Sequence, residues 1–226
     1  PLFKYPPITL AAACKMIEVA SAASLDVLHV HYAIPWAVCA HLAREVVHES
    51  CRQLKIVTTL HGTDITLVGQ EPQFFNMTKF GIERSDAVTA VSKYLAAETR
   101  KVFGVQCPVD VIYNSVDASR FRPGSERCRK HFAPQGEKLM IHVSNFRAVK
   151  NIPDVIKTFA LVRKRLPARL LMAGEGPELP NARSLTKELG LEKDVLFLVN
   201  QASVEDILNF EELFILTAAY EIFGLA

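Results

Sequence analysis

The segment HGTD could do chemistry, because it directly follows the apolar run KIVTTL. A glycine such as Gly62 lets the chain turn sharply or approach a ligand closely. The side chains of His61 and Asp64 offer polar contacts at the end of the predicted strand. The spacing supports a structural interpretation equally well, in which Asp64 or Thr63 caps a following helix and His61 packs in the core.

The segment HVHY places His29 and His31 on one face of another predicted strand, and Tyr32 follows directly. Two histidines at this spacing can ligate a metal ion, but no third ligand accompanies them at a characteristic spacing. The pattern therefore favours core or substrate-contacting histidines over a metal site.

The segment SNFRAVKN carries polar and cationic residues between a predicted strand and a predicted helix. Asn145, Arg147 and Lys150 lie in this stretch. Cations beside a helix N-terminus suit a phosphate or diphosphate, since the helix dipole also favours negative charge there. A lone arginine and lysine in a loop are more often plain surface charge, so this signal is weak by itself.

The segment MAGEGPE holds Gly174 and Gly176, and Pro177 is suited to begin a helix. It lacks the third glycine of a dinucleotide fingerprint, and the sequence contains neither GxGxxG nor GxxxxGK[ST]. Two classes of nucleotide site are therefore disfavoured.

The segment YEIFGLA closes the sequence and places Glu221 beside a predicted strand end, followed by Phe223 and Gly224. A carboxylate and exposed backbone amides at this point could hold a polar ligand. On spacing alone, a loop glutamate without a ligand is the simpler interpretation.

Strand-like apolar runs alternate with helical patterns along the whole chain, which is typical of β-α-β units around a parallel sheet. Because the strands read as continuous apolar runs, both faces of each sheet are expected to be covered. The predicted strands are 26–31, 55–60, 87–91, 109–113, 138–144, 168–174, 194–199 and 212–218. The predicted helices are 9–23, a segment after Pro35, 73–84, 92–103, 152–165, a segment ending at Leu189, and 203–210.

The alternation stops over residues 114–136, a turn-rich stretch that predicts a linker. We therefore expect an α/β protein of two incomplete Rossmann-like lobes, each a doubly wound parallel sheet. The predicted lobes are residues 1–122 and 123–226.

Composition excludes several functional classes. Lys and Arg total 26 against 24 Asp and Glu, so no whole-chain field recruits nucleic acid or an anionic membrane. Five cysteines without a CxxC pair favour a reducing compartment, and no transmembrane span or secretory signal is visible. We expect a cytoplasmic protein. The chain runs from Pro1 to Ala226, and we interpret it as a fragment open at both ends.

Seven segments together resemble one enzyme family. In order they are HVHYAIPWAVCAHLA, TTLHGTDITLVG, DAVTAVSKYLAAET, VIYNSVD, HVSNFRAVKN, LLMAGEGPE and YEIFGL. They resemble the retaining glycosyltransferases of family 4, which have the two-lobed GT-B architecture. TTLHGTDIT and HVSNFRxVK are the specific segments, whereas GEGPE and ExFG identify only the wider class. The resemblance implies bacterial bacillithiol biosynthesis, with N-acetylglucosamine moved from UDP-N-acetylglucosamine to the hydroxyl of L-malate.

The resemblance also implies roles for individual residues. These are catalytic His61 and Glu221, donor-binding Asn145, Arg147, Lys150, Phe223 and Gly224, and acceptor-binding Tyr32, Gly62, Thr63 and Lys79. No metal or other cofactor is expected, because a DxD pair is absent and cationic side chains can stabilise the leaving phosphate instead. The expected partners are the two small-molecule substrates, with no nucleic acid and no stable membrane insertion.

The sequence departs from the family pattern at several positions. Asn145 stands where many members carry an arginine, Ile222 stands where a small residue is usual, and Lys79 stands where we expect arginine. The glycine-rich loop expected upstream and the second glutamate expected downstream are missing, so the fragment itself is expected to be inactive or nearly so. Two alternatives stay open: a family 4 enzyme with another acceptor, and a noncatalytic nucleotide-sugar binding module.

Overall fold

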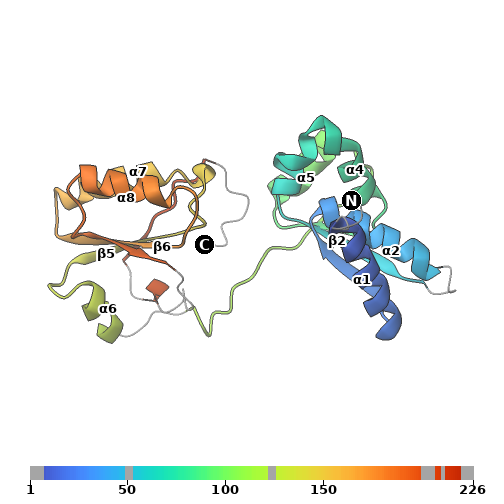
Figure 1. Ribbon diagram of the computed structural model, residues 1–226, viewed down its shortest axis with the longest axis horizontal. Helices are drawn as coiled ribbons and strands as arrows, with labels where there is room; N and C mark the ends of the chain where they lie inside the picture. The colour runs from blue at the N-terminus through green and yellow to red at the C-terminus, as the bar shows by residue number, and fades with distance from the viewer. Residues whose placement is uncertain (1–7, 49–52, 122–125, 200–206, 210–211, 220–226) are drawn as a thin grey trace, which may run out of the picture. The chain divides into compact units, whose positions relative to one another are not determined.

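The computed structural model describes residues 8–48, 53–121, 126–199, 207–209 and 212–219. The chain divides into two compact units, residues 1–114 and 115–226, and each is described by itself (Figure 1). Both units are α/β with a parallel sheet, so the predicted fold class is confirmed.

The first unit is built on a four-stranded sheet in the order β1-β2-β3-β4. Every neighbouring pair in this sheet is parallel. The strands are β1 (Val27–His31), β2 (Lys55–Leu60), β3 (Ala87–Ala90) and β4 (Asp110–Val111). Because the strands follow one another in sequence order, right-handed crossovers place the connecting helices on the same face.

The helices of the first unit include α5 (Lys93–Phe103), which has a capping residue at each end. They are α1 (Ile8–Ala22), α2 (Val38–His48), α3 (Thr63–Thr66), α4 (Pro72–Glu83) and α5 (Lys93–Phe103), with short turns η1 (Ala33–Ala37) and η2 (Val68–Gln70). The hydroxyl of Ser92 accepts a hydrogen bond from the N–H of Leu95 at the start of α5. Gly104, at φ 61°, ends the same helix in the left-handed conformation that glycine adopts readily.

Only one face of β1 is buried. Leu28 and Val30 pack with Ala40 and Ala43 of α2 in the core, whereas the alternate residues of the strand are exposed. The expectation that both faces of this strand are covered is therefore wrong for the described residues. The exposed face carries His29 and the other histidine of HVHY, as the alternation of strand side chains requires.

The second unit has a parallel sheet in the order β7-β6-β5-β8. The strands are β5 (Lys138–Val143), β6 (Ala168–Ala173), β7 (Val195–Leu198) and β8 (Leu213–Phe214). The helices are α6 (Glu126–Phe132), α7 (Ile152–Arg163) and α8 (Leu179–Glu188), with the turn η3 (Ala148–Lys150). The strand order reverses between β5 and β8, and such a switch point is where open α/β sheets bind ligands.

Both faces of the second sheet are covered, as the apolar strands predict. Figure 1 shows α7 and α8 on one face and α6 on the other. Phe146 and Phe159 are fully buried in the core on the first of these faces. Leu139 and Ile141 of β5 pack with Ala133, just after α6, on the opposite face.

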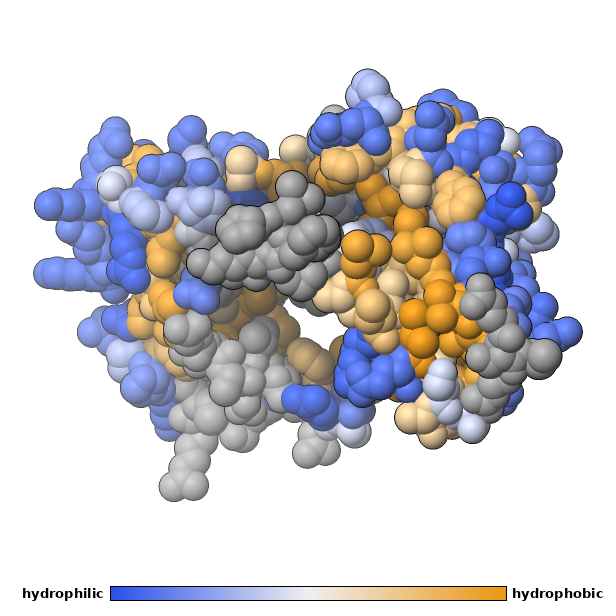
Figure 2. Space-filling view, turned by 45° about the vertical axis from the view of Figure 1, so that its right-hand side comes forward, coloured by the Kyte–Doolittle hydropathy of each residue, from blue (hydrophilic) through white to orange (hydrophobic). Residues whose placement is uncertain are grey.

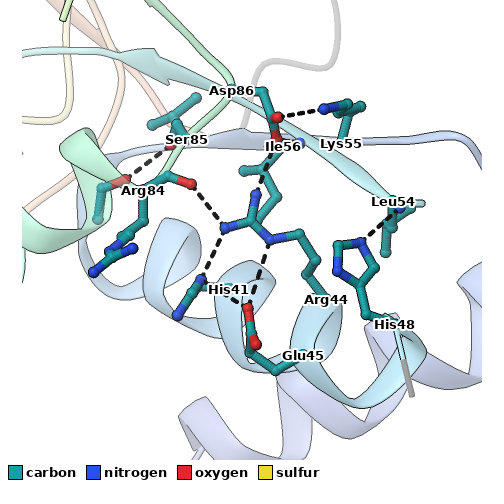
Figure 3. Close-up of polar contacts among 12 residues, drawn as sticks. His41, Arg44, Glu45, His48, Leu54, Lys55, Ile56, Arg84, Ser85 and Asp86 are labelled. Atoms are coloured by element: carbon teal, nitrogen blue, oxygen red, sulfur yellow. Dashed lines mark hydrogen bonds and ion pairs between the residues drawn. The ribbon is translucent and has the colours of Figure 1, made fainter. Parts of the chain in front are cut away.

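A partly buried carboxylate at the amino edge of the first sheet binds two cations and a backbone N–H (Figure 3). Asp86 directly precedes β3. Its Oδ2 accepts a hydrogen bond of 2.9 Å from the N–H of Ile56 and lies 3.0 Å from Nη1 of Arg44. Its Oδ1 lies 2.9 Å from Nζ of Lys55. Burial alone raises the pKa of Asp86, but these contacts outweigh it and the pKa lies below its usual value.

The second unit repeats this arrangement at its own amino edge. Glu212 directly precedes β8, and its Oε2 accepts a hydrogen bond of 2.6 Å from the N–H of Leu139. Its Oε1 lies 2.6 Å from Nη2 of Arg129 and 3.4 Å from Nζ of Lys138. Burial opposes ionisation here too, yet the N–H and the two cations hold the pKa of Glu212 below its usual value.

One segment differs from its predicted structure. The expected linker, residues 114–136, contains helix α6. Nη2 of Arg129 on this helix donates to the backbone oxygen of Glu137 and pairs with Glu212, so contacts distant in sequence hold a segment whose local pattern is weak. Most of the predicted helix 203–210 lies outside the described residues.

Hydrophobic residues also reach the surface. Figure 2 shows them in orange among hydrophilic residues of the first unit. They include Ile8, Leu10 and Val19 of α1 and Leu42 and Val46 of α2. Within the described part of the chain, every helix is too short or too polar to cross a membrane.

Candidate active site

The carboxyl edge of the first sheet brings His31, Tyr32 and His61 together. Nδ1 of His31 lies 2.7 Å from Nε2 of His61, and one of the two nitrogens donates the proton. The ring of Tyr32 lies 5.0 Å from that of His61, between centroids. Two of the residues singled out in HVHY and the histidine of HGTD therefore form one polar and aromatic cluster.

The backbone at this edge adopts conformations that few residues tolerate. Gly62 has φ 121°, which a side chain would strain, so the glycine permits the turn from β2 into α3. Tyr32 has φ 74° without being a glycine. Such conformations cost of order 1–3 kcal/mol and cluster at ligand sites, so this turn is a further reason to regard the edge as functional.

Asp64 is buried and connects two loops. Its Oδ2 accepts a hydrogen bond of 2.8 Å from the N–H of Ala33, and its Oδ1 accepts one of 3.0 Å from the N–H of Gly62. Burial raises the pKa of Asp64, although the backbone N–H groups oppose that shift. Neither Asp64 nor Thr63 caps α3, because Gly62 occupies the N-cap position without a capping side chain. Asp64 instead fixes the loop after β1 against the loop after β2.

His29, which is exposed, is hydrogen-bonded to a row of two buried threonines on the same face of the sheet. Its Nε2 lies 2.7 Å from Oγ1 of Thr59, which lies 2.8 Å from Oγ1 of Thr89. The row crosses β1, β2 and β3. Burial lowers the pKa of His29, and the neighbouring His31 lowers it further. A neutral imidazole and two hydroxyls therefore support the strand ends below the cluster.

The remaining acceptor-side candidates lie on different elements. Thr63 is exposed at the first position of α3. Lys79 lies on α4, where its Nζ is 3.8 Å from Oε1 of Glu83. The exposed ion pair is weak, so it leaves the ammonium able to exchange partners.

In the second unit, the loop after β5 is tied to the segment after β8 at the switch point. Oγ1 of Thr217 donates to the backbone oxygens of Lys150 and Asn151, at 3.1 and 2.9 Å. The N–H of Ala219 donates to the backbone oxygen of Val149 at 2.9 Å. These bonds position the loop that carries the predicted donor-binding cations.

His142, on β5, also connects the strand ends at this switch point. Its Nδ1 donates to the backbone oxygen of Ile215 at 2.9 Å, and its Nε2 lies 2.8 Å from Oγ of Ser144. Burial lowers the pKa of His142, the bond to Ile215 opposes this shift, and the charge of Lys150 adds to it. The neutral ring therefore carries its proton on Nδ1 and accepts one from Ser144.

The two glycines of GEGPE pack against this loop from the β6 side. A Cβ on Gly174 would lie 1.9 Å from the backbone oxygen of Ser144, and one on Gly176 would lie 2.5 Å from that of Asn145. Both glycines also have positive φ, at 127° and 157°. They are required for close backbone packing, a structural role that their spacing did not reveal.

The predicted donor residues lie on the loop these contacts fix. Asn145 and Arg147 are exposed on either side of the buried Phe146, and Lys150 is half-buried at the end of η3. Sequence reasoning missed Thr217 and His142, because a threonine and a histidine in apolar strands give no local signal. Glu221, Phe223 and Gly224 lie outside the described residues.

The described residues offer no set of three or more His, Cys, Asp or Glu side chains arranged to hold a metal ion. The cluster of His31, His61 and Tyr32 instead offers hydrogen bonds and aromatic surface. The β5 loop offers a guanidinium, an ammonium and an amide. The edge with the histidine cluster suits an uncharged or anionic ligand. The edge with the β5 loop suits a phosphate.

Comparison with known proteins identifies the family. The family model described as Glycosyltransferase Family 4 matches residues 1–120, and the model described as Glycosyl transferases group 1 matches residues 125–226. The chain belongs to glycosyltransferase family 4. The resemblance predicted from the seven segments is thereby confirmed.

Among curated proteins, the family 4 chain is 44% identical to the N-acetyl-alpha-D-glucosaminyl L-malate synthase of Bacillus anthracis, over 99% of this chain and 58% of that relative. The chain thus spans little more than half the length of this relative. Two solved structures share its fold. The sucrose-phosphate synthase of Thermosynechococcus elongatus has a TM-score of 0.74 at 18% identity, over 100% of this chain and 59% of that chain. Anabaena HepE in complex with UDP has a TM-score of 0.71 at 17% identity, over 92% and 57%.

Proposed function

We propose that the protein is a retaining glycosyltransferase that moves N-acetylglucosamine from UDP-N-acetylglucosamine to the hydroxyl of L-malate. The observation that carries this proposal is the 44% identity to the Bacillus anthracis synthase across both units of the chain. A relative this similar over both lobes makes a shared donor and acceptor the simplest expectation. The UDP-bound structure of HepE, with the same fold, supports a nucleotide-sugar donor.

In this proposal, the β5 loop binds the donor diphosphate. Negative charge grows on the UDP phosphate as the glycosidic bond breaks, so fixed cations stabilise the transition state more than the ground state. Lys150 and Arg147 supply such cations, and Asn145 adds a hydrogen-bonding amide. The bonds from Thr217 to the loop backbone keep these side chains from having to reorganise during the reaction.

The cluster at the first sheet receives the acceptor in the same proposal. Tyr32, Gly62 and Thr63 surround His61, which meets the acceptor and the donor sugar, while Lys79 supplies a charge for a carboxylate. The malate hydroxyl attacks the anomeric carbon from the face that the phosphate leaves and passes its proton to that phosphate, which departs as UDP. This course gives retention without a carboxylate nucleophile of the hydrolase type. Glu221, Phe223 and Gly224 complete the donor side as the family pattern implies.

The proposal includes a cytoplasmic location. Cys14, Cys39 and Cys107 are free thiols in the part of the chain that the structure describes. Free thiols are typical of reducing compartments.

The deciding experiment incubates the full-length protein with UDP-N-acetylglucosamine and either L-malate or a panel of other hydroxy acids and sugars. Products are identified by mass spectrometry, and GDP-mannose serves as the control donor. A glucosaminyl-malate that forms only with malate and UDP-N-acetylglucosamine is the expected result. Product on another acceptor would keep the family chemistry and reject malate, whereas UDP binding without turnover would support the binding-module alternative.

A further inference from the structure

His31 touches His61 because of the register between β1 and β2. His31 is paired with Thr59 in the parallel ladder, so both side chains lie on the same face of the sheet, where His31 is exposed and Thr59 is buried. His61 follows β2 directly, and its ring returns over the same face, 4.9 Å from the ring of His31 between centroids. Neither HVHY nor HGTD reveals this contact alone.

The separation of 2.7 Å between the two ring nitrogens allows only one proton between them. Two N–H groups would repel each other there, and so would two lone pairs. The groups that face His61 are His31 and His29 from β1, Asp64 from α3, and the ring of Tyr32. Burial lowers the pKa of His61, the two histidines lower it further, and Asp64 opposes them. Because only one proton fits between the two nitrogens, the pair carries at most one positive charge in this geometry.

The other ring nitrogen of His61 is available to a ligand. Nδ1 of His61 makes no hydrogen bond within the residues that the structure describes, whereas Nε2 is bound to His31. A single contact thus decides which nitrogen of His61 meets solvent and whether that nitrogen donates or accepts.

We propose that His31 is a positioning residue, which holds the ring of His61 in one orientation and one tautomer so that Nδ1 of His61 meets the hydroxyl or carboxylate of the acceptor. The acceptor part of this inference rests on the proposed function. The contact between the two histidines does not, so the two can be tested separately.

The first test is NMR of the ¹⁵N-labelled full chain, in which the ring nitrogens of His61 report the tautomer directly. In the wild type, one nitrogen is expected to be protonated and the other not at neutral pH. His31→Phe keeps a planar ring and removes the bond, so both nitrogens shift toward an average and the pKa of His61 rises. His31→Gln restores one hydrogen-bonding partner for Nε2 of His61. It is therefore expected to return part of the difference between the chemical shifts of the two ring nitrogens.

His41→Gln is the matched control, because His41 lies on α2 and its Nδ1 is bound to Arg44 instead of to His61. It is expected to leave the His61 signals unchanged. Unchanged His61 shifts and titration in His31→Phe would overturn the inference. His31 is exposed, so His31→Phe is expected to fold, and the circular dichroism of each variant checks this.

The second test is the transfer reaction of the full-length protein. His31→Phe is expected to lower kcat by about tenfold or more through misplacement of His61, with the donor KM within about twofold of wild type. The acid limb of the pH profile moves up with the pKa of His61. A tautomer change without an effect on kcat would overturn the positioning role. A tautomer change in a protein with no transfer activity would refute the proposed function but leave the contact established.

Discussion

The amino and carboxyl edges of the two sheets treat charge in opposite ways. At the amino edges, Asp86 and Glu212 each bind two cations and a strand N–H, and the pKa of both carboxyls is lowered. At the carboxyl edge of the first sheet, Asp64 is held by backbone N–H groups and burial raises its pKa. The guanidinium of Arg147, at the other carboxyl edge, has no ion pair among the described residues.

This contrast teaches where the protein uses its charges for stability and where it keeps them for ligands. A carboxylate that is paired with cations in the folded state stabilises the fold, and its oxygens are already occupied by those partners and not available to a substrate. An unpaired guanidinium and neutral histidines contribute little to folding but are ready to bind. Mutations at the two edges are therefore expected to separate stability from activity.

The largest effect is expected from Lys150→Ala, at the carboxyl edge. Loss of a cation near the developing phosphate charge is expected to lower kcat/KM by about 10²-fold to 10³-fold. Lys157→Ala, an exposed lysine on α7, is the matched control and is expected to keep full activity. Equal losses in both variants would mean that the β5 loop has no special role.

Gly174→Ala tests whether the close backbone packing between Gly174 and Ser144, at the carboxyl edge of the second sheet, stabilises the fold. The new Cβ would meet the backbone oxygen of Ser144 at a strained φ, and we expect a loss of about 3 kcal/mol in the free energy of unfolding. Gly190→Ala is the control, because it has positive φ but no atom within 4 Å of the new Cβ. Its expected cost is about 1 kcal/mol. Urea unfolding measures the free energy of unfolding of both variants. If the backbone packs closely at Gly174, the loss in Gly174→Ala exceeds the loss in Gly190→Ala.

Asp86→Asn tests the amino edge. The amide cannot neutralise the charges of Arg44 and Lys55. Because the Asp86 side chain is only 29% exposed, solvent compensates little for this loss. We therefore expect a loss of about 2 kcal/mol in the free energy of unfolding. Activity per folded molecule is expected to be that of wild type. Glu45→Gln, on an exposed and long contact to Arg44, should cost less than about 0.5 kcal/mol. A loss of turnover in folded Asp86→Asn would contradict the division between the edges.

The smallest effect concerns acid pH. Because the folded pKa values of Asp86 and Glu212 lie below those of the unfolded chain, their contribution is fully present above the unfolded values of about 3.9 and 4.3 and is lost as pH falls through the folded values. Stability should therefore decline below about pH 5. Chemical unfolding across this range is expected to show a shallower decline for Asp86→Asn and for Glu212→Gln. Parallel curves for the variants and the wild type would contradict the paired state of these carboxylates.

Much of the fold followed from local pattern. Alternating strands and helices predicted parallel sheets, and HGTD and SNFRAVKN pointed to strand ends that the structure places at the carboxyl edges. Local sequence cannot report which strands become neighbours, and the order β7-β6-β5-β8 creates the switch point. The predicted site roles of these residues stay predictions.

The contacts that sequence could not provide are all between distant segments. His31 meets His61 across a strand pair, and Thr217 binds the backbone of Lys150 from far along the chain. Helix α6 was missed because contacts made outside the helix, from Arg129 to Glu137 and Glu212 and from Ala133 to the core, help to hold it, and its local pattern is weak. Such pairings depend on three-dimensional proximity, which composition and spacing do not encode.

The hydrogen bond from the N–H of Ile56 to Asp86, at the start of β2, also affects the other end of that strand. A slip of one residue between neighbouring strands would turn every side chain to the opposite face. The bond to Ile56, with the Lys55 ion pair beside it, penalises such a slip at the start of β2. Thr59 then lies on the same face as His31, and the turn after β2 brings the ring of His61 to that face. A carboxylate that never meets the ligand therefore decides which surface of the sheet can bind it.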